Sequence, residues 1–128
     1  LFNCVNSMAR VGKVAYVTSD SLDSETIVGF NNYSLEVDKE VILPKFLYYF
    51  MVDKRFLHRV RALVKPAINQ ASFASKEWNH MLIAYPSINE QKKIVGLLDE
   101  ASSLLDHEKI QIEKIAAVRT NLSQSLGI

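Results

Sequence analysis

The stretch Tyr85-Pro86-Ser87-Ile88-Asn89-Glu90-Gln91-Lys92-Lys93-Ile94-Val95 decides the architecture of this chain, because it joins a short apolar segment to a long helix. Pro86 ends the extended run, since its fixed φ and missing N–H suit the exit from a strand. Ser87 can cap the helix, and the Glu90 carboxylate, three residues later, can reach back to the N–H of the capping residue. The stretch therefore predicts a strand, a proline and a capped helix start.

The predicted helix runs from about Ile88 to Leu126, because no proline interrupts these residues. At about 1.5 Å per residue it is nearly 60 Å long, and a small domain could not bury that length along one side. Its apolar stripe consists of Ile94, Leu98, Ala101, Leu105, Ile112, Ile115, Leu122 and Leu126; Glu108 and Arg119 interrupt the stripe, and Leu97, Leu104 and Val118 widen it. This heptad-like spacing predicts a coiled-coil-like helix that pairs with a second long helix. The alternative, folding back on the domain, leaves the far end unburied.

Length and composition predict one domain, or a small domain with one appended element. The chain has 128 residues, of which 48% are apolar, and no uncharged apolar run is long enough to cross a membrane. It shows no signal-peptide pattern, and Cys4 is its only cysteine, which fits a reducing compartment. We therefore expect a cytoplasmic location. The chain begins with Leu1 inside an apparent strand, so we also expect an incomplete N-terminus.

The region before the long helix predicts an α+β fold. Alternating β-branched and aromatic residues predict short strands over 12–18, 26–30, 33–37 and 81–85, in a small, mostly antiparallel sheet. Pro44 is well placed to open a helix that continues to about Leu63, with a restart at Asp53. We expect residues 67–75 to form a polar loop and 75–79 to form one helical turn.

The middle of this region carries a surplus of positive charge. Residues 46–80 contain six basic and two acidic side chains, whereas residues 1–45 contain four basic and six acidic ones. Basic side chains can neutralise phosphates, while amide, hydroxyl and lysine groups can bind base edges. The candidate DNA-binding residues are Lys54, Arg55, Arg59, Arg61, Lys65, Asn69, Gln70, Ser72 and Lys76. A solvated helix face with a structural Asn-Gln turn is the alternative interpretation.

The sequence predicts no catalytic and no metal site. It lacks a glycine-rich cofactor loop and a Walker A motif, and Phe30-Asn31-Asn32-Tyr33 only faintly resembles a methyltransferase motif because it lacks both prolines. Glu36-Val37-Asp38-Lys39 resembles a nuclease element but has no Pro-Asp upstream. The three histidines, His58, His80 and His107, are not at metal-ligand spacing. We therefore expect a non-catalytic protein.

Three patches resemble the specificity (S) subunits of type I restriction-modification enzymes. They are 9–14 (Ala-Arg-Val-Gly-Lys-Val), 43–50 (Leu-Pro-Lys-Phe-Leu-Tyr-Tyr-Phe) followed by Arg55-Phe56, and 67–70 (Ala-Ile-Asn-Gln) followed by a strand, Pro86 and 90–95. Each patch alone is weakly specific, but together they span residues 9 to 126 in the family's order. The chain departs from the family in having Lys65-Pro66-Ala67 where a Gly-Ser-like pair is usual, and one proline where two are common.

The resemblance implies a division of the chain and a function. Residues 1–86 would be the latter part of a target-recognition domain that binds double-stranded DNA, and 87–128 a conserved spacer helix. The spacer would pair antiparallel with a second helix, from another copy or from the missing half of the subunit. Methyltransferase (M) subunits, which carry S-adenosylmethionine, would dock on the complex, and this chain would need no cofactor. Two alternatives stay open: a coiled-coil interaction module without DNA binding, and a fragment of a fused methyltransferase.

Overall fold

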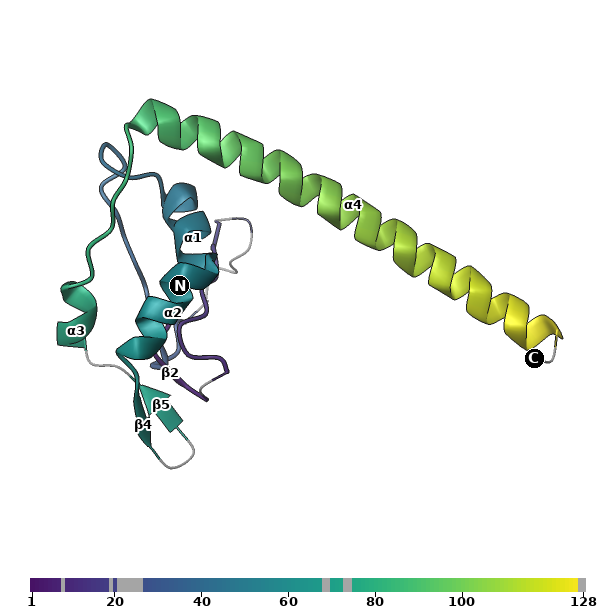
Figure 1. The fold of residues 1–128 in the computed structure, drawn as a ribbon, viewed down its shortest axis with the longest axis horizontal. Coiled ribbons are helices and arrows are strands. Elements are labelled where there is room, and N and C mark those ends of the chain that lie inside the picture. The colour runs from purple at the N-terminus through teal and green to yellow at the C-terminus, as the bar shows by residue number, and fades with distance from the viewer. Residues whose placement is uncertain (8, 19, 21–26, 68–69, 73–74, 127–128) are drawn as a thin grey trace. The chain divides into compact units, whose positions relative to one another are not determined.

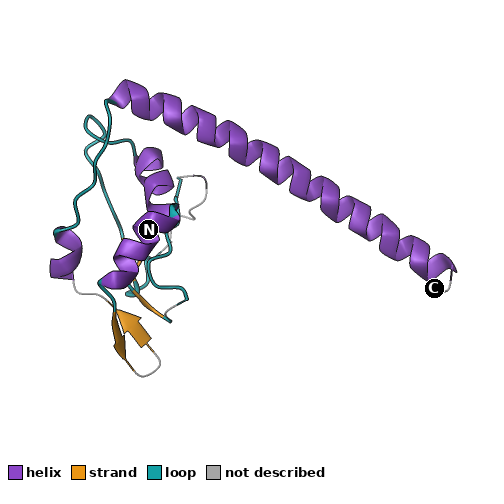
Figure 2. Cartoon of the chain, viewed as in Figure 1, coloured by secondary structure: helices purple, strands orange, loops and turns teal. Residues whose placement is uncertain are grey.

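The computed structural model describes residues 1–7, 9–18, 20, 27–67, 70–72 and 75–126 (Figure 1). The chain forms two compact units, Leu1–Lys92 and Lys93–Ile128. The first unit combines helices with short antiparallel strands, and the described residues of the second unit are part of one long helix (Figure 2). This confirms the predicted α+β class.

Helices α1 (Pro44–Val52) and α2 (Lys54–Ala62) follow one another with only Asp53 between them. Pro44 begins α1, where its missing N–H costs no hydrogen bond. The Asp53 carboxylate caps α2 by accepting a 2.8 Å hydrogen bond from the Arg55 N–H. The predicted restart at Asp53 is therefore confirmed, and its cause is a side-chain cap.

The strands form two small antiparallel groups. In one, β1 (Phe2–Asn3) pairs with β3 (Asn32–Tyr33), with Phe2 opposite Tyr33. In the other the order is β2-β5-β4, formed by Val5–Asn6, Gln70–Ser72 and Lys65–Ala67. The β4–β5 hairpin lies beside the end of α2 (Figure 1).

Most of the predicted strand boundaries are wrong. Within 12–18 only Val14 makes a bridge, to Phe2, and the described residues of 26–30 and 81–85 form no strand. The prediction over 33–37 retains only Tyr33, and the loop predicted over 67–75 contains β5 instead. Alternating apolar residues direct side chains to the core, but a strand also needs a backbone partner, which the alternation does not supply.

The predicted helical turn over 75–79 is confirmed as α3 (Ser75–Asn79), and the long helix as α4 (Ile88–Leu126). The capping box at the start of α4 forms as expected. The Ser87 N–H donates to Glu90 Oε2 at 3.1 Å, and the Glu90 N–H donates to the Ser87 hydroxyl at 3.4 Å. The hydrogen bonds from Ser87 hold the pKa of the Glu90 carboxyl below its ordinary value.

One small hydrophobic core joins α1, α2, α3, β1 and β5 of the first unit. Its buried residues are Phe2, Cys4, Val11, Leu47, Met51, Phe56, Val60 and Ala71. The ring of Trp78 on α3 stacks on Phe2 with centroids 4.3 Å apart and meets Phe56 edge-on. Strand β1, helix α2 and helix α3 are thus held together by aromatic contacts, which fixes the surface that α2 presents to solvent.

Candidate nucleic-acid interface

Helix α2 separates its apolar residues from its basic ones. Phe56 and Val60, one turn apart, are buried in the core. Lys54, His58 and Arg61 follow one another at helical spacing on the opposite side and are exposed. The helix therefore presents cationic side chains to solvent on an element whose position is fixed by packing.

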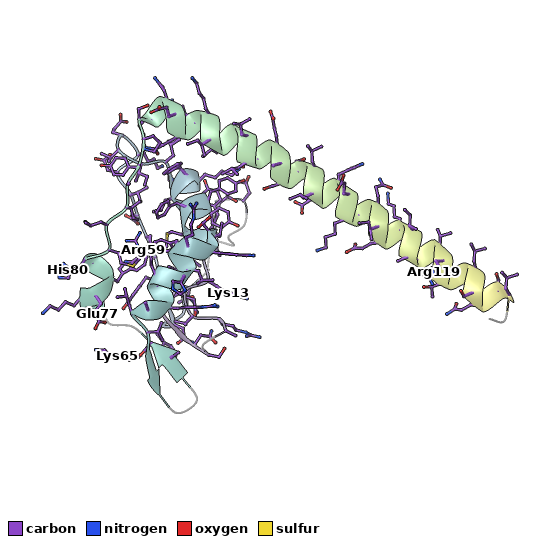
Figure 3. All side chains as sticks on the ribbon, viewed as in Figure 1. Lys13, Arg59, Lys65, Glu77, His80 and Arg119 are labelled. Carbon is purple, nitrogen blue, oxygen red and sulfur yellow. The ribbon has the colours of Figure 1, made fainter. Side chains whose placement is uncertain are left out.

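Both acidic residues of the basic segment are paired with basic ones. The Arg55 guanidinium lies 3.0 Å from the Asp53 carboxylate. The Lys65 ammonium lies 3.1 Å from the Glu77 carboxylate; both of these residues are labelled in Figure 3. The hydrogen bonds from Arg55 hold the pKa of Asp53 below its ordinary value, so this acid is charged at neutral pH. Within residues 46–80, each acidic residue is therefore paired with a basic one. The other four basic residues of this segment have no acidic partner in it: Lys54, Arg59, Arg61 and Lys76.

Two of those four cations are held by backbone carbonyls. Arg59 donates to the Leu82 oxygen at 3.1 Å, and Arg61 donates to the Ala9 oxygen at 3.4 Å. A neutral acceptor orients a guanidinium without cancelling its charge, and each guanidinium has further N–H donors available. Both side chains are exposed and remain available to an anion.

The other two cations, Lys54 and Lys76, are exposed and form no ion pair with a described residue. Two of the predicted base-reading residues lie in β5. Ser72 is half-buried there, and the backbone of Gln70 forms the first residue of the strand. Asn69 lies outside the described residues, as does the side chain of Gln70. Their predicted contacts with bases stay predictions.

The fold brings two further basic residues, Arg10 and Lys13, to the side of α2. They flank Gly12, whose φ of +84° lets the chain turn tightly. A side chain at Gly12 would come within 2.9 Å of Leu57 and 3.1 Å of Val60, so this turn packs directly on α2. Arg10 and Lys13 are exposed. The sequence does not predict Arg10 and Lys13 as DNA-binding residues, because nothing in the local sequence reveals contact with a helix over forty residues later.

A surface hollow of the first unit lies apart from the basic residues of 46–80. It has a volume of about 410 Å³ and lies between α1, β3 and residues 14–17 and 27–29. The described residues that line it carry no charged side chain. No three His, Cys, Asp or Glu side chains in the described part of the chain are grouped to hold a metal ion. No helix among the described residues is long and apolar enough to cross a membrane.

The predicted helix-pairing residues all lie on α4. They are Ile94, Leu98, Ala101, Leu105, Ile112, Ile115 and Leu122, and each is exposed. The described residues of the second unit all belong to α4, so among them the apolar stripe has no partner helix. Pairing of these residues with another helix stays a prediction.

A comparison with known protein families identifies the class to which the chain belongs. Residues 3–117 match the family described as "Type I restriction modification DNA specificity domain", so the chain belongs to that family. The resemblance inferred from the sequence is thereby confirmed.

A curated relative is named as the specificity subunit of the type I restriction enzyme MjaX of Methanocaldococcus jannaschii. It is 27% identical over 126 residues, which cover 98% of this chain and 29% of the relative. The chain therefore spans less than a third of the relative's length. No solved structure matches the chain.

Proposed function

We propose that this chain is part of the DNA-recognition subunit of a type I restriction-modification system. The observation that carries the proposal is the charge arrangement around α2. Within 46–80 both acids are matched by Arg55 and Lys65, while Lys54, Arg59, Arg61 and Lys76 remain uncompensated. A surface that keeps its positive charge on rigid elements suits the phosphate backbone of double-stranded DNA.

In this proposal the basic residues have two roles. Lys54, Arg59 and Arg61, joined by Arg10 and Lys13 on the adjoining turn, neutralise phosphates and fix the register of the protein on the duplex. Lys76, Ser72, Gln70 and Asn69 contact base edges, for which amide groups suit adenine and lysine suits guanine. The DNA sequence that they read is set by their detailed placement on the bound duplex.

The chain itself is proposed to be non-catalytic and to bind no cofactor. Methyltransferase subunits carrying S-adenosylmethionine supply the reaction, and the specificity subunit directs them to a bipartite DNA site. Helix α4 is proposed to pair with a second long helix and so to space two recognition units. The proposed setting of this complex is the cytoplasm, where DNA and the methyltransferase subunits meet.

Methyl transfer from labelled S-adenosylmethionine to duplex DNA tests this proposal. The 128-residue chain alone is expected to transfer nothing, whereas the complete specificity subunit with its methyltransferase partner is expected to methylate its target. A Lys54→Gln/Lys76→Gln variant of that complex should methylate more slowly at limiting DNA. Lys39→Gln/Lys92→Gln removes the same charge from exposed positions outside the segment and serves as the control. Transfer by the chain alone, or equal effects of the two variants, would refute the proposal.

A further inference from the structure

The apolar stripe of α4 contains two charged residues whose positions constrain any partner. From Ile94 to Leu126 the stripe advances in alternating steps of four and three residues, the spacing of a two-helix seam. The seam, as we use the term, comprises residues 94, 98, 101, 105, 108, 112, 115, 119, 122 and 126. Eight of these are apolar; Glu108 and Arg119 carry opposite charges.

We propose that α4 pairs with α4 of a second copy of this chain, antiparallel, in the register that places Glu108 of each copy against Arg119 of the other. In an antiparallel pair with this seam, the two-fold axis then falls between residues 113 and 114. Ile112 faces the partner's Ile115, Leu105 faces the partner's Leu122, and Ala101 faces the partner's Leu126. Each layer, meaning a pair of facing seam residues, is either apolar on both sides or oppositely charged. The two-fold axis generates a second, identical copy of each layer.

Other arrangements leave the charges unmatched. In a parallel, in-register pair Glu108 meets its own copy and Arg119 meets its own copy, which sets like charges together. Shifting the antiparallel pair by one heptad toward greater overlap sets Arg119 against Ala101 and Glu108 against Ile112. An unpaired charge buried against an apolar residue is costly, so the charges select the register even where the ion pair itself adds little.

The rest of the helix surface is consistent with this selection. The flanking positions next to the proposed layers are Ser102, Leu104, Lys109, Gln111, Ala116, Val118, Ser123 and Ser125, and only Lys109 is charged. Flanking ion pairs therefore cannot set the register, and the choice falls to Glu108 and Arg119. The leucines and isoleucines of the proposed layers are well exposed, from 56% at Leu122 to 69% at Ile115, so a second helix has surface to cover.

The inference rests on the helix pairing in the proposed function but not on DNA binding, so it is tested without DNA. In sedimentation equilibrium at micromolar concentration the chain is expected to be a dimer. Glu108→Arg and Arg119→Glu should each raise the dimer dissociation constant by about tenfold or more, because each sets like charges together. The double variant Glu108→Arg/Arg119→Glu should restore dimerisation, because the pair is rebuilt with its charges exchanged. Glu113→Arg, an exposed position off the seam, controls for net charge.

Disulfide formation gives a second readout of the same register. A mixture of Leu105→Cys and Leu122→Cys chains should form a mixed disulfide on mild oxidation, whereas Leu105→Cys mixed with Ile115→Cys should not. A monomer, or a double variant no tighter than the single ones, would overturn the proposal. So would preferential cross-linking of residue 105 to residue 115, which corresponds to the register shifted by one heptad. These outcomes would not bear on DNA binding by the complete subunit, which is tested separately.

Discussion

The side-chain oxygen of Gln91, in the first turn of α4, accepts a 2.8 Å hydrogen bond from the backbone N–H of Leu43, which precedes α1. The amide nitrogen of Gln91 donates to the carbonyl oxygens of Val41 and Pro86 at 3.0 and 2.9 Å. Gln91 is fully buried, and it is the only buried polar side chain among the described residues. Within the first unit, the Gln91 amide therefore links the first turn of α4 to the segment that precedes α1.

Gln91→Leu should destabilise the first unit. Leucine keeps most of the volume but leaves one backbone N–H and two carbonyls without partners, at a cost of about 2–4 kcal/mol in the free energy of unfolding. Urea unfolding followed by the fluorescence of Trp78, which stacks on Phe2 in the core, measures this change. Gln124→Leu, on an exposed part of α4, should change the unfolding free energy by less than about 0.5 kcal/mol. Coincident unfolding curves for wild type and Gln91→Leu would contradict the role assigned to this amide.

The capping box should make the start of α4 sensitive to acid. A Glu carboxyl ordinarily titrates near 4.5, and the hydrogen bonds from Ser87 lower the pKa of Glu90 in the folded chain. Its stabilising effect is therefore complete above pH 4.5 and is lost as the pH falls through the lowered value. Ser87→Ala should reduce helicity at neutral pH, and the difference from wild type should shrink at acid pH. Circular dichroism between neutral pH and about pH 3 measures both effects.

Ser103→Ala is the control for the capping experiment, since Ser103 is exposed within α4 and caps nothing. Its effect on helicity should be a small gain that does not depend on pH. A Ser87→Ala difference that stayed constant across the titration would show that the Glu90 carboxylate does not support the cap.

Gly12→Ala should destabilise the turn beside α2. The φ of +84° disfavours any residue with a Cβ, and the new methyl group would also lie 2.9 Å from Leu57 and 3.1 Å from Val60. Leu57 can move its side-chain end, but the backbone strain remains, so we expect a loss of about 2 kcal/mol. Gly29→Ala is the matched control, because a Cβ added at Gly29 would lie 4.0 Å from its nearest contact, the Asn32 Nδ2 atom. Thermal unfolding of the two variants should separate them, and equal melting temperatures would argue against the turn geometry.

The sequence predicted the helices better than the strands, for physical reasons. Asp53 and the Ser87–Glu90 pair are local signals, since a cap and the residues it satisfies lie within one turn. The sheet depends on contacts such as Phe2 opposite Tyr33 and Val5 opposite Ser72, which join residues far apart in sequence. Alternation alone could not reveal which segments find such partners. The same limit hid the approach of the Gly12 turn to α2, and with it the place of Arg10 and Lys13 at the candidate surface.

The charge count predicted the basic segment but not its internal pairing. Arg55 and Asp53 lie two residues apart, so their ion pair could be anticipated, whereas that of Lys65 and Glu77 depends on the β4–β5 hairpin returning toward α3. Arg55 and Lys65 are matched by acids, and Arg59 and Arg61 also hold backbone carbonyls. Substituting Lys54 and Lys76 therefore tests charge with the least risk to the fold.

The salt dependence of DNA binding tests the central claim most directly. The dissociation constant of the complete specificity subunit with its methyltransferase partner would be measured at several salt concentrations, for wild type, Lys54→Gln/Lys76→Gln and the control Lys39→Gln/Lys92→Gln. Each lost phosphate contact should reduce the slope of log affinity against log salt by about 0.9 in magnitude. Lys54→Gln/Lys76→Gln removes one such contact, at Lys54, because Lys76 is assigned to a base edge. We predict this reduction for Lys54→Gln/Lys76→Gln and no change for the control. An unchanged slope and affinity for Lys54→Gln/Lys76→Gln would contradict the assignment of this surface to DNA.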